Sequence, residues 1–253
     1  APSWLLMGLP QPTRKADSSL ALGSGQIMYS LHRAGCRLTN GRPVLRMVLV
    51  LATANRQKIE ELSALLGDLA CRLVPLPARA EDPPLPEPGP TLAANAEAKA
   101  LAAAARAGCL ALADDSGLEV DALGGEPGVW SSRFLGGGAT DADRNAALLA
   151  ALRTYPWHGR TARFRCAVAV ADAAGRVLCR SEGILEGFIA YEALGTAGFG
   201  YDPIFFVPEL SQTLAEAGPA AKNRISHRAR ALLACRPFLA ALAAGSAAEP
   251  LPR

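Results

Sequence analysis

The chain is organised around one stretch, Leu110-Ala-Leu-Ala-Asp-Asp-Ser-Gly-Leu-Glu-Val120. Its apolar start is typical of a buried strand, and we expect that strand to stop at the adjacent acids Asp114 and Asp115, ahead of a Ser-Gly turn. Successive side chains of a strand point to opposite faces, so only one acid can face a given cleft and the other must find donors elsewhere. An acid in a cleft can bind Mg²⁺ or act as a general base, whereas a simple Asx turn would explain the same residues without a function.

The composition is that of a globular protein of one or two domains. The chain has 253 residues, of which 50% are hydrophobic, enough for a sizeable core. No run of about 18 uninterrupted apolar residues occurs, so we expect no membrane span. The six cysteines are scattered without a Cys-x-x-Cys pair. This predicts reduced thiols in a cytoplasmic protein rather than a zinc site or a disulfide framework.

Charge divides the chain into two parts. Residues 1–46 contain six basic residues and one acidic residue, which leaves a net charge of −2 for residues 47–253 out of the total of +3. A slightly acidic body lacks the basic face that binding to a nucleic acid polymer requires, so no such partner is expected.

The first 46 residues lack a hydrophobic period and are rich in Gly, Ser, Pro and Arg, which predicts disorder. Met47 opens an apolar run typical of the first strand of an α/β domain. Residues 1–46 are therefore interpreted as a translated extension upstream of a start at Met47, with an Arg-rich targeting segment as the alternative. Residues 243–253 are expected to form a frayed tail.

Alternating strand and helix patterns predict one α/β domain over residues 47–242. The expected strands cover residues 47–52, 71–76, 110–113, 118–123, 163–170 and 176–185, the last two forming a hairpin. The expected helices cover residues 59–66, 91–107, 140–152 and 227–242.

A tight turn, Thr53-Ala-Asn-Arg-Gln-Lys58, leads from the first strand into a helix. A helix N-terminus presents unpaired N–H groups and the positive end of its dipole, which suits phosphate oxygens. Thr53 and Asn55 can cap or donate, and Lys58 can neutralise charge. An ordinary helix cap is the alternative, because the turn lacks the glycines of a P-loop.

The Ala-rich helix carries Asn95 and Lys99 at i and i+4, on one face. There they can point an amide and an ammonium at one ligand, or they can form a solvated face.

A second candidate segment is Gly198-Phe-Gly-Tyr-Asp-Pro203. Its glycines allow close approach of the backbone, and Phe199 can stack on a planar ring. Asp202 precedes a proline and is expected to be extended, with its carboxylate exposed to accept from a ligand N–H. A turn packed on core aromatics is the alternative.

The last candidate segment is Lys222-Asn-Arg-Ile-Ser-His-Arg228. Ser226 can cap the final helix, which places His227 and Arg228 in its first turn. Cations there oppose the helix dipole unless an anion or an acceptor-rich ligand is present, so this placement favours a function.

In this order, six motifs of the chain resemble the inosine/xanthosine triphosphate pyrophosphatase family, the XTP/dITP diphosphatases, over about residues 47–242. The motifs are Thr-x-Asn-x-x-Lys at 53–58, Asn-Ala-x-x-Lys-Ala at 95–100, Asp-Asp-Ser-Gly-Leu at 114–118, Gly-Gly-x-Pro-Gly at 124–128, Gly-Phe-Gly-Tyr-Asp-Pro at 198–203 and Lys-Asn-x-x-Ser-His-Arg at 222–228.

The resemblance implies an α/β fold with an elongated, long mixed sheet flanked by helices, two lobes with a central cleft, and a homodimer. It implies Mg²⁺-dependent hydrolysis of ITP, dITP or XTP to the nucleoside monophosphate and pyrophosphate. By position, Asp115 matches the general base and metal-binding carboxylate, and Glu87 matches a second Mg²⁺ ligand. The positions matching triphosphate-binding residues are Thr53, Ala54, Asn55, Arg56, Gln57, Lys58, Lys99 and Ser116. Those matching the purine pocket are Phe199, Gly200, Tyr201, Asp202, Lys222, His227 and Arg228.

Selectivity for a 6-oxo purine requires donors near O6. Arg228, Lys222 or a protonated His227 can donate and, when charged, cannot accept from an amino group, so adenine would leave donors unpaired. Ala54, Ala94 and Trp130 depart from the residues frequent in the family, which bears on fine specificity more than on activity. Two alternatives stay open: a related pyrophosphatase for modified pyrimidine or methylated nucleotides, and a non-catalytic nucleotide sensor.

Overall fold

The structure is a computed structural model that describes residues 36–39, 42–45, 47–77 and 81–245. The strands of its main sheet are β3 (Met47–Leu51), β4 (Cys71–Pro75), β5 (Leu110–Val120), β6 (Pro127–Gly128), β7 (Thr161–Ala171), β8 (Val177–Ile189), β9 (Phe205–Val207) and β10 (Gln212–Thr213). Their order is β10-β9-β8-β7-β5-β3-β4, with β6 paired to β5. β3 is parallel to both β4 and β5, and the other pairs are antiparallel.

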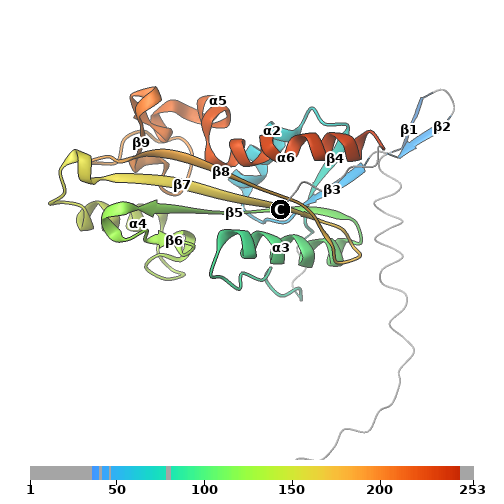
Figure 1. Cartoon of the computed structure of the whole chain (residues 1–253), viewed down its shortest axis with the longest axis horizontal. Coiled ribbons are helices and arrows are strands. Elements are labelled where there is room, and N and C mark those ends of the chain that lie inside the picture. Colours follow the sequence, from blue (N-terminus) through green and yellow to red (C-terminus); the bar gives the residue numbers. More distant parts are fainter. Residues whose placement is uncertain (1–35, 40–41, 46, 78–80, 246–253) are drawn as a thin grey trace, which may run out of the picture. The chain divides into compact units, whose positions relative to one another are not determined.

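Helices cover both faces of this sheet. They are α2 (Arg56–Leu66), α3 (Leu92–Ala107), α4 (Asp141–Ala151), α5 (Leu214–Ile225) and α6 (His227–Ala243). α3 packs against β5 and β7, whereas α6 packs against β7 and β8 from the opposite face (Figure 1). The predicted α/β class, a long mixed sheet flanked by helices, is confirmed.

Short polar side chains fix where the helices begin. The hydroxyl of Thr91 accepts from the N–H of Ala94 at the start of α3, and Ser226 does the same for Ala229 at the start of α6, both at 3.1 Å. Such caps satisfy backbone donors that have no partner inside the helix. α3 ends at Gly108, whose φ of 65° is the left-handed conformation that glycine adopts at low cost.

The prediction that the strand stops at Asp114 is wrong, because β5 continues through both acids to Val120. Its backbone pairs with β7 without interruption from Ala111 to Val120, so the main chain gains nothing by turning. The two separate strands expected on either side of the acids are thus one. The alternation of side chains still holds, and it places Asp114 and Asp115 on opposite faces of the sheet.

The two faces have different cores. Under α3 the core consists largely of alanine, from Ala96, Ala100 and Ala103 on the helix to Ala113 and Ala169 on the strands. Alanine lets the helix approach the sheet closely, so that other side chains on the same helix face are buried too. Under α2 and α6 the core has larger side chains, including Leu, Val, Phe and Cys.

Midway along its length, β5 loses its neighbour on one side. β3 pairs with it only as far as Leu112, and β6 joins it only at Leu118 and Glu119. Among the described strands, none covers this edge of β5 between those points, and both acids lie there. The carboxyl end of a parallel strand beside such a gap is where open α/β sheets commonly bind ligands.

Most of the predicted disordered extension, residues 1–46, lies outside the described residues, as does most of the predicted tail. Of these segments the structure describes two antiparallel paired strands, β1 (Cys36–Thr39) and β2 (Arg42–Leu45), and the end of α6 at Ala243. Among the helices that the structure describes, none combines the length and the apolar composition needed to cross a membrane.

Gly183 determines how closely α6 approaches the sheet. A Cβ at this position of β8 would lie 2.1 Å from the carbonyl oxygen of His227 and 2.5 Å from the N–H nitrogen of Ala231. Both are backbone atoms of α6, which cannot give way as a flexible side chain can. Without a side chain at Gly183, the first turn of α6 lies directly on the strand.

We therefore expect Gly183→Ala to lower the free energy of unfolding by about 1–3 kcal/mol. Gly137→Ala is the matched control, because a Cβ there meets no atom within 4 Å. Both changes restrict the unfolded chain similarly, so their difference isolates the clash. Urea titrations of the two variants measure it, and equal midpoints would contradict the close contact.

Candidate functional site

A cavity of about 720 Å³ lies at the unpaired edge of β5. All but one of the predicted site residues line it. They are Thr53, Ala54, Asn55, Gln57, Lys58, Glu87, Lys99, Asp115, Ser116, Phe199, Gly200, Tyr201, Asp202, Lys222, His227 and Arg228. The exception is Arg56, whose exposed side chain pairs with Glu60 on the outside of α2.

The turn before α2 is both a cap and part of the cavity wall. The side chain of Asn55 accepts from the N–H of Lys58, and the hydroxyl of Thr53 accepts from the N–H of Asn55, each at 3.1 Å. The helix-cap alternative is thus structurally correct. The same turn nevertheless places the N-terminus of α2 at the cavity, where it can bind an anion.

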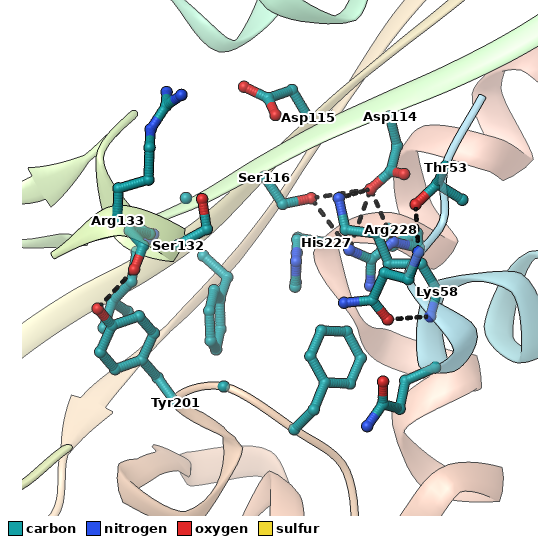
Figure 2. A pocket seen from close by; sticks show the side chains of 18 of the residues that line it. Thr53, Lys58, Asp114, Asp115, Ser116, Ser132, Arg133, Tyr201, His227 and Arg228 are labelled. Carbon is teal, nitrogen blue, oxygen red and sulfur yellow. Dashed lines mark hydrogen bonds and ion pairs between the residues drawn. The ribbon is translucent and has the colours of Figure 1, made fainter. Parts of the chain in front are cut away.

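Asp114 forms the centre of a buried ion cluster on the α2 and α6 side of β5. Lys58 and Arg228 both lie 3.0 Å from its carboxylate, and the hydroxyl of Ser116 lies at 3.3 Å (Figure 2). Burial alone would raise the pKa of Asp114, but these two cations hold it well below its usual value. Asp114 is therefore a structural anion that holds two cavity-lining cations.

Glu61 extends this cluster and was missed in the sequence. Its carboxylate lies 2.8 Å from the ammonium of Lys222 and also contacts the guanidinium of Arg228. Three cations and three carboxylates are thus linked, since Lys222 pairs with Asp202 as well. The available signal was that Glu61 lies one helical turn after Lys58, on the same face of α2.

Asp202 is not exposed, contrary to expectation. It is 1% exposed, and its Oδ2 accepts from the ammonium of Lys222 at 2.5 Å and from the N–H of Phe199 at 2.9 Å. Burial raises its pKa even though Lys222 lowers it. Asp202 therefore ties the loop that carries Phe199 to Lys222 of α5. The ammonium of Lys222 lies over the ring of Phe199, 4.4 Å from its centroid.

Contacts with α4 and with Ser131 fix the rest of this loop. Gly200 donates its N–H to Asp141 at 2.8 Å and accepts from the side chain of Asn145 at 3.0 Å, both on α4. The hydroxyl of Tyr201 donates to the carbonyl of Ser131 at 2.9 Å, so its ring is a buried support rather than an exposed stacking face.

His227 cannot serve as a protonated donor near neutral pH. Its ring stacks on Phe164, with centroids 4.6 Å apart and an interplanar angle of 11°. Complete burial, with the positive charges of Arg228 and Lys222, lowers its pKa well below the ordinary value. The option of a protonated His227 is thus wrong, and the imidazole is neutral.

Asp115 lies on the α3 side, with partners of its own. Its Oδ1 accepts from Lys99 at 2.6 Å and its Oδ2 from Asn95 at 3.0 Å. Lys99 also lies 3.2 Å from Glu87, which in turn pairs with Arg133 at 2.8 Å. Although burial would lower the pKa of Lys99, Asp115 and Asp114 raise it, so the ammonium stays charged. In Figure 2, Asp115 and Arg133 lie on the opposite side of β5 from Asp114.

Asp115 and Glu87 suit a metal ion that a bound ligand also coordinates. Among the described residues, no group of three or more His, Cys, Asp or Glu side chains converges as a metal site. Asp115 and Glu87 do converge on one cation, the ammonium of Lys99. Mg²⁺ is usually held by one or two carboxylates together with phosphate oxygens and waters, which this pair can provide.

Comparisons with known proteins confirm the family that the six motifs indicated. The model of the Ham1 family matches residues 49–238. The chain is 51% identical over 186 residues to a dITP/XTP pyrophosphatase of Desulforamulus reducens, covering 74% of this chain and 92% of that protein. It is 46% identical over 184 residues to one of Geobacter sulfurreducens, covering 73% and 92% respectively. The structure of a HAM1 protein from Coxiella burnetii matches with a TM-score of 0.67 and 42% identity, covering 76% of this chain and 98% of that one.

Removing the central anion should destabilise the protein. Asp114→Asn leaves the buried Arg228 and the partly buried Lys58 without their shared carboxylate, and we expect the free energy of unfolding to fall by about 3–5 kcal/mol. Glu60→Gln, which removes the exposed partner of Arg56, should change it by less than about 1 kcal/mol. Urea unfolding measures both. Similar losses in the two variants would mean that Asp114 does not hold the cluster.

Stability should also depend on pH through His227. Its pKa is lowered in the folded state, so its contribution is complete above the unfolded-state pKa of about 6.5 and is lost as the pH falls below that value. His227→Gln should remove up to about 1.4 kcal/mol per pH unit of this decline between about pH 6.5 and 5. The control is the same change at the exposed His158, which should leave the slope intact. Unfolding titrations at each pH test this, and a wild-type slope in His227→Gln would contradict it.

Proposed function

This chain belongs to the Ham1 family, and we propose from that premise that it hydrolyses non-canonical purine nucleoside triphosphates, such as ITP, dITP and XTP, to the monophosphate and pyrophosphate. The observation that carries the proposal is the convergence of five of the six motifs, all but the one at 124–128, on one cavity, with a carboxylate pair on one side of β5 and an aromatic ring with cations on the other. We further propose a homodimer, as the resemblance implies, and a cytoplasmic location, which the scattered cysteines support.

Asp115 is the proposed general base. It accepts the proton of the water that attacks the α-phosphorus, while the bond to the β-phosphate oxygen breaks and pyrophosphate leaves. The amide of Asn95 donates to its Oδ2, which fixes the orientation of the carboxylate. The ammonium of Lys99, which lies 2.6 Å from Oδ1 of Asp115, can donate to phosphate oxygens instead. There it stabilises the negative charge that builds up on the leaving group.

The triphosphate is placed at the turn before α2, where the N-terminus of the helix and Lys58 line the cavity. Asp115 and Glu87 would hold Mg²⁺, which supplies charge neutralisation for the phosphates when bound. Positioning by the residues of this chain and electrostatic stabilisation then account for most of the catalysis.

The base is placed against Phe199, beside Lys222 and Arg228. Both cations are held by carboxylates and cannot accept a hydrogen bond, so they suit the 6-oxo group of hypoxanthine or xanthine. A 6-amino group would leave a buried donor unpaired, at a cost of about 1–3 kcal/mol. The neutral His227 offers one donor and one acceptor instead, so it does not discriminate by charge.

The first test is an assay of the full chain with Mg²⁺ and, side by side, ITP, ATP and GTP, identifying the phosphate product. We expect pyrophosphate, released from ITP at least about 10-fold faster than from ATP. Asp115→Asn should lower turnover about 10²–10⁴-fold while ITP affinity, measured by calorimetry, changes little. Asp68→Asn, the same change at a surface carboxylate, should retain activity.

Other outcomes would select the alternatives. Binding of ITP without pyrophosphate release would indicate a nucleotide sensor. Faster hydrolysis of modified pyrimidine or methylated triphosphates than of ITP would indicate the related pyrophosphatase. Normal turnover by Asp115→Asn would exclude its assigned role.

A further inference from the structure

All four oxygens of the carboxylate pair, Asp115 and Glu87, have a donor within the protein. Lys99 contacts one oxygen of each, at 2.6 Å and 3.2 Å, Asn95 contacts the second oxygen of Asp115 at 3.0 Å, and Arg133 contacts the second oxygen of Glu87 at 2.8 Å. Two carboxylates therefore face two cations, and the group carries no net charge.

A divalent cation entering alone meets two obstacles here. The group has no net negative charge to attract it, and each oxygen that it takes must first lose a hydrogen bond or an ion-pair contact, three of the four with a cation. The two cations would be left close to the metal, where they repel it.

A triphosphate changes this balance because it brings acceptors for the displaced donors. Lys99 is largely buried, and Arg133 lines the same cavity while its guanidinium remains partly exposed. Both can therefore exchange a carboxylate oxygen for a phosphate oxygen without leaving the cavity. Arginine suits this exchange, since its planar fork matches the geometry of both carboxylate and phosphate.

We propose that Lys99 and Arg133 are exchangeable counter-ions. They contact Asp115 and Glu87 until a triphosphate binds; its phosphate oxygens then replace the carboxylate oxygens as their partners, and the carboxylates become free to bind the divalent cation. This inference rests on the proposed function. It makes Arg133 a phosphate-binding residue of the site, and it makes metal binding dependent on the nucleotide.

The test is Mn²⁺ binding to the full chain without nucleotide, measured by electron paramagnetic resonance of free Mn²⁺. Lys99→Met frees one oxygen of each carboxylate, and we expect Mn²⁺ affinity to rise at least about 10-fold. Arg133→Met frees a single oxygen and should give a several-fold rise. Arg144→Met is the matched control, because Arg144 lines the same cavity but pairs with Asp141 instead, and its affinity should equal that of the wild type.

Circular dichroism establishes that each variant is folded, and the more exposed Arg133→Met keeps the test decisive if Lys99→Met does not fold. Adding Asp115→Asn to Lys99→Met should abolish the gain. The proposal is overturned if the wild type already binds Mn²⁺ as tightly as Lys99→Met, or if Arg133→Met and Arg144→Met do not differ. These results leave ITP hydrolysis by the wild type untouched, so a failure of the exchange and a failure of the proposed function are separate outcomes.

Discussion

The structure depends on the cost of placing two adjacent carboxylates on an interior strand. Asp114 and Asp115 are 2% and 8% exposed, and the pleat of β5 sends them to opposite faces. A buried charge without a partner is unstable, so each face of the sheet must supply its own cations. α2 and α6 supply Lys58 and Arg228 on one face, and α3 supplies Lys99 on the other. The helices that flank the sheet thus also complete the site.

This requirement explains which parts of the fold can be predicted from the sequence. Helix caps, the β7–β8 hairpin and the order of elements follow from local residue types, and the alternation of a strand already separates Asp114 from Asp115. The uninterrupted β5 could not be predicted, because an acid pair breaks a strand unless cations distant in sequence neutralise it. Those cations are Lys58, which lies 56 residues before Asp114 in the sequence, and Arg228, which lies 114 residues after it.

The site residues were predicted better as a set than as individual roles. Of the site residues predicted from the order of the motifs, all but Arg56 line the cavity. The roles of Asp202 and His227 depend on their burial, which the spacing of a motif does not show. A carboxylate before a proline looks available to a ligand until Lys222 is known to lie against it. Glu61 had no motif of its own, and its part in the cluster is evident only once α5 and α6 are placed beside α2.

The pairing of charges on both sides of β5 also bears on how an anionic ligand is selected. Because the cavity cations are compensated by carboxylates, they create no broad positive field that would attract every polyanion. A ligand gains most when its oxygens replace carboxylate oxygens one for one, which requires the right spacing as well as charge. On the α6 side Lys222 and Arg228 stay tied to their carboxylates, so that side favours a neutral acceptor such as a ring carbonyl. On the α3 side we propose that Lys99 and Arg133 exchange their carboxylate oxygens for phosphate oxygens, so these two cations, together with the N-terminus of α2, favour the triphosphate. The two acids of β5, by dividing their partners between the faces, therefore give the two ends of one cavity different chemistry.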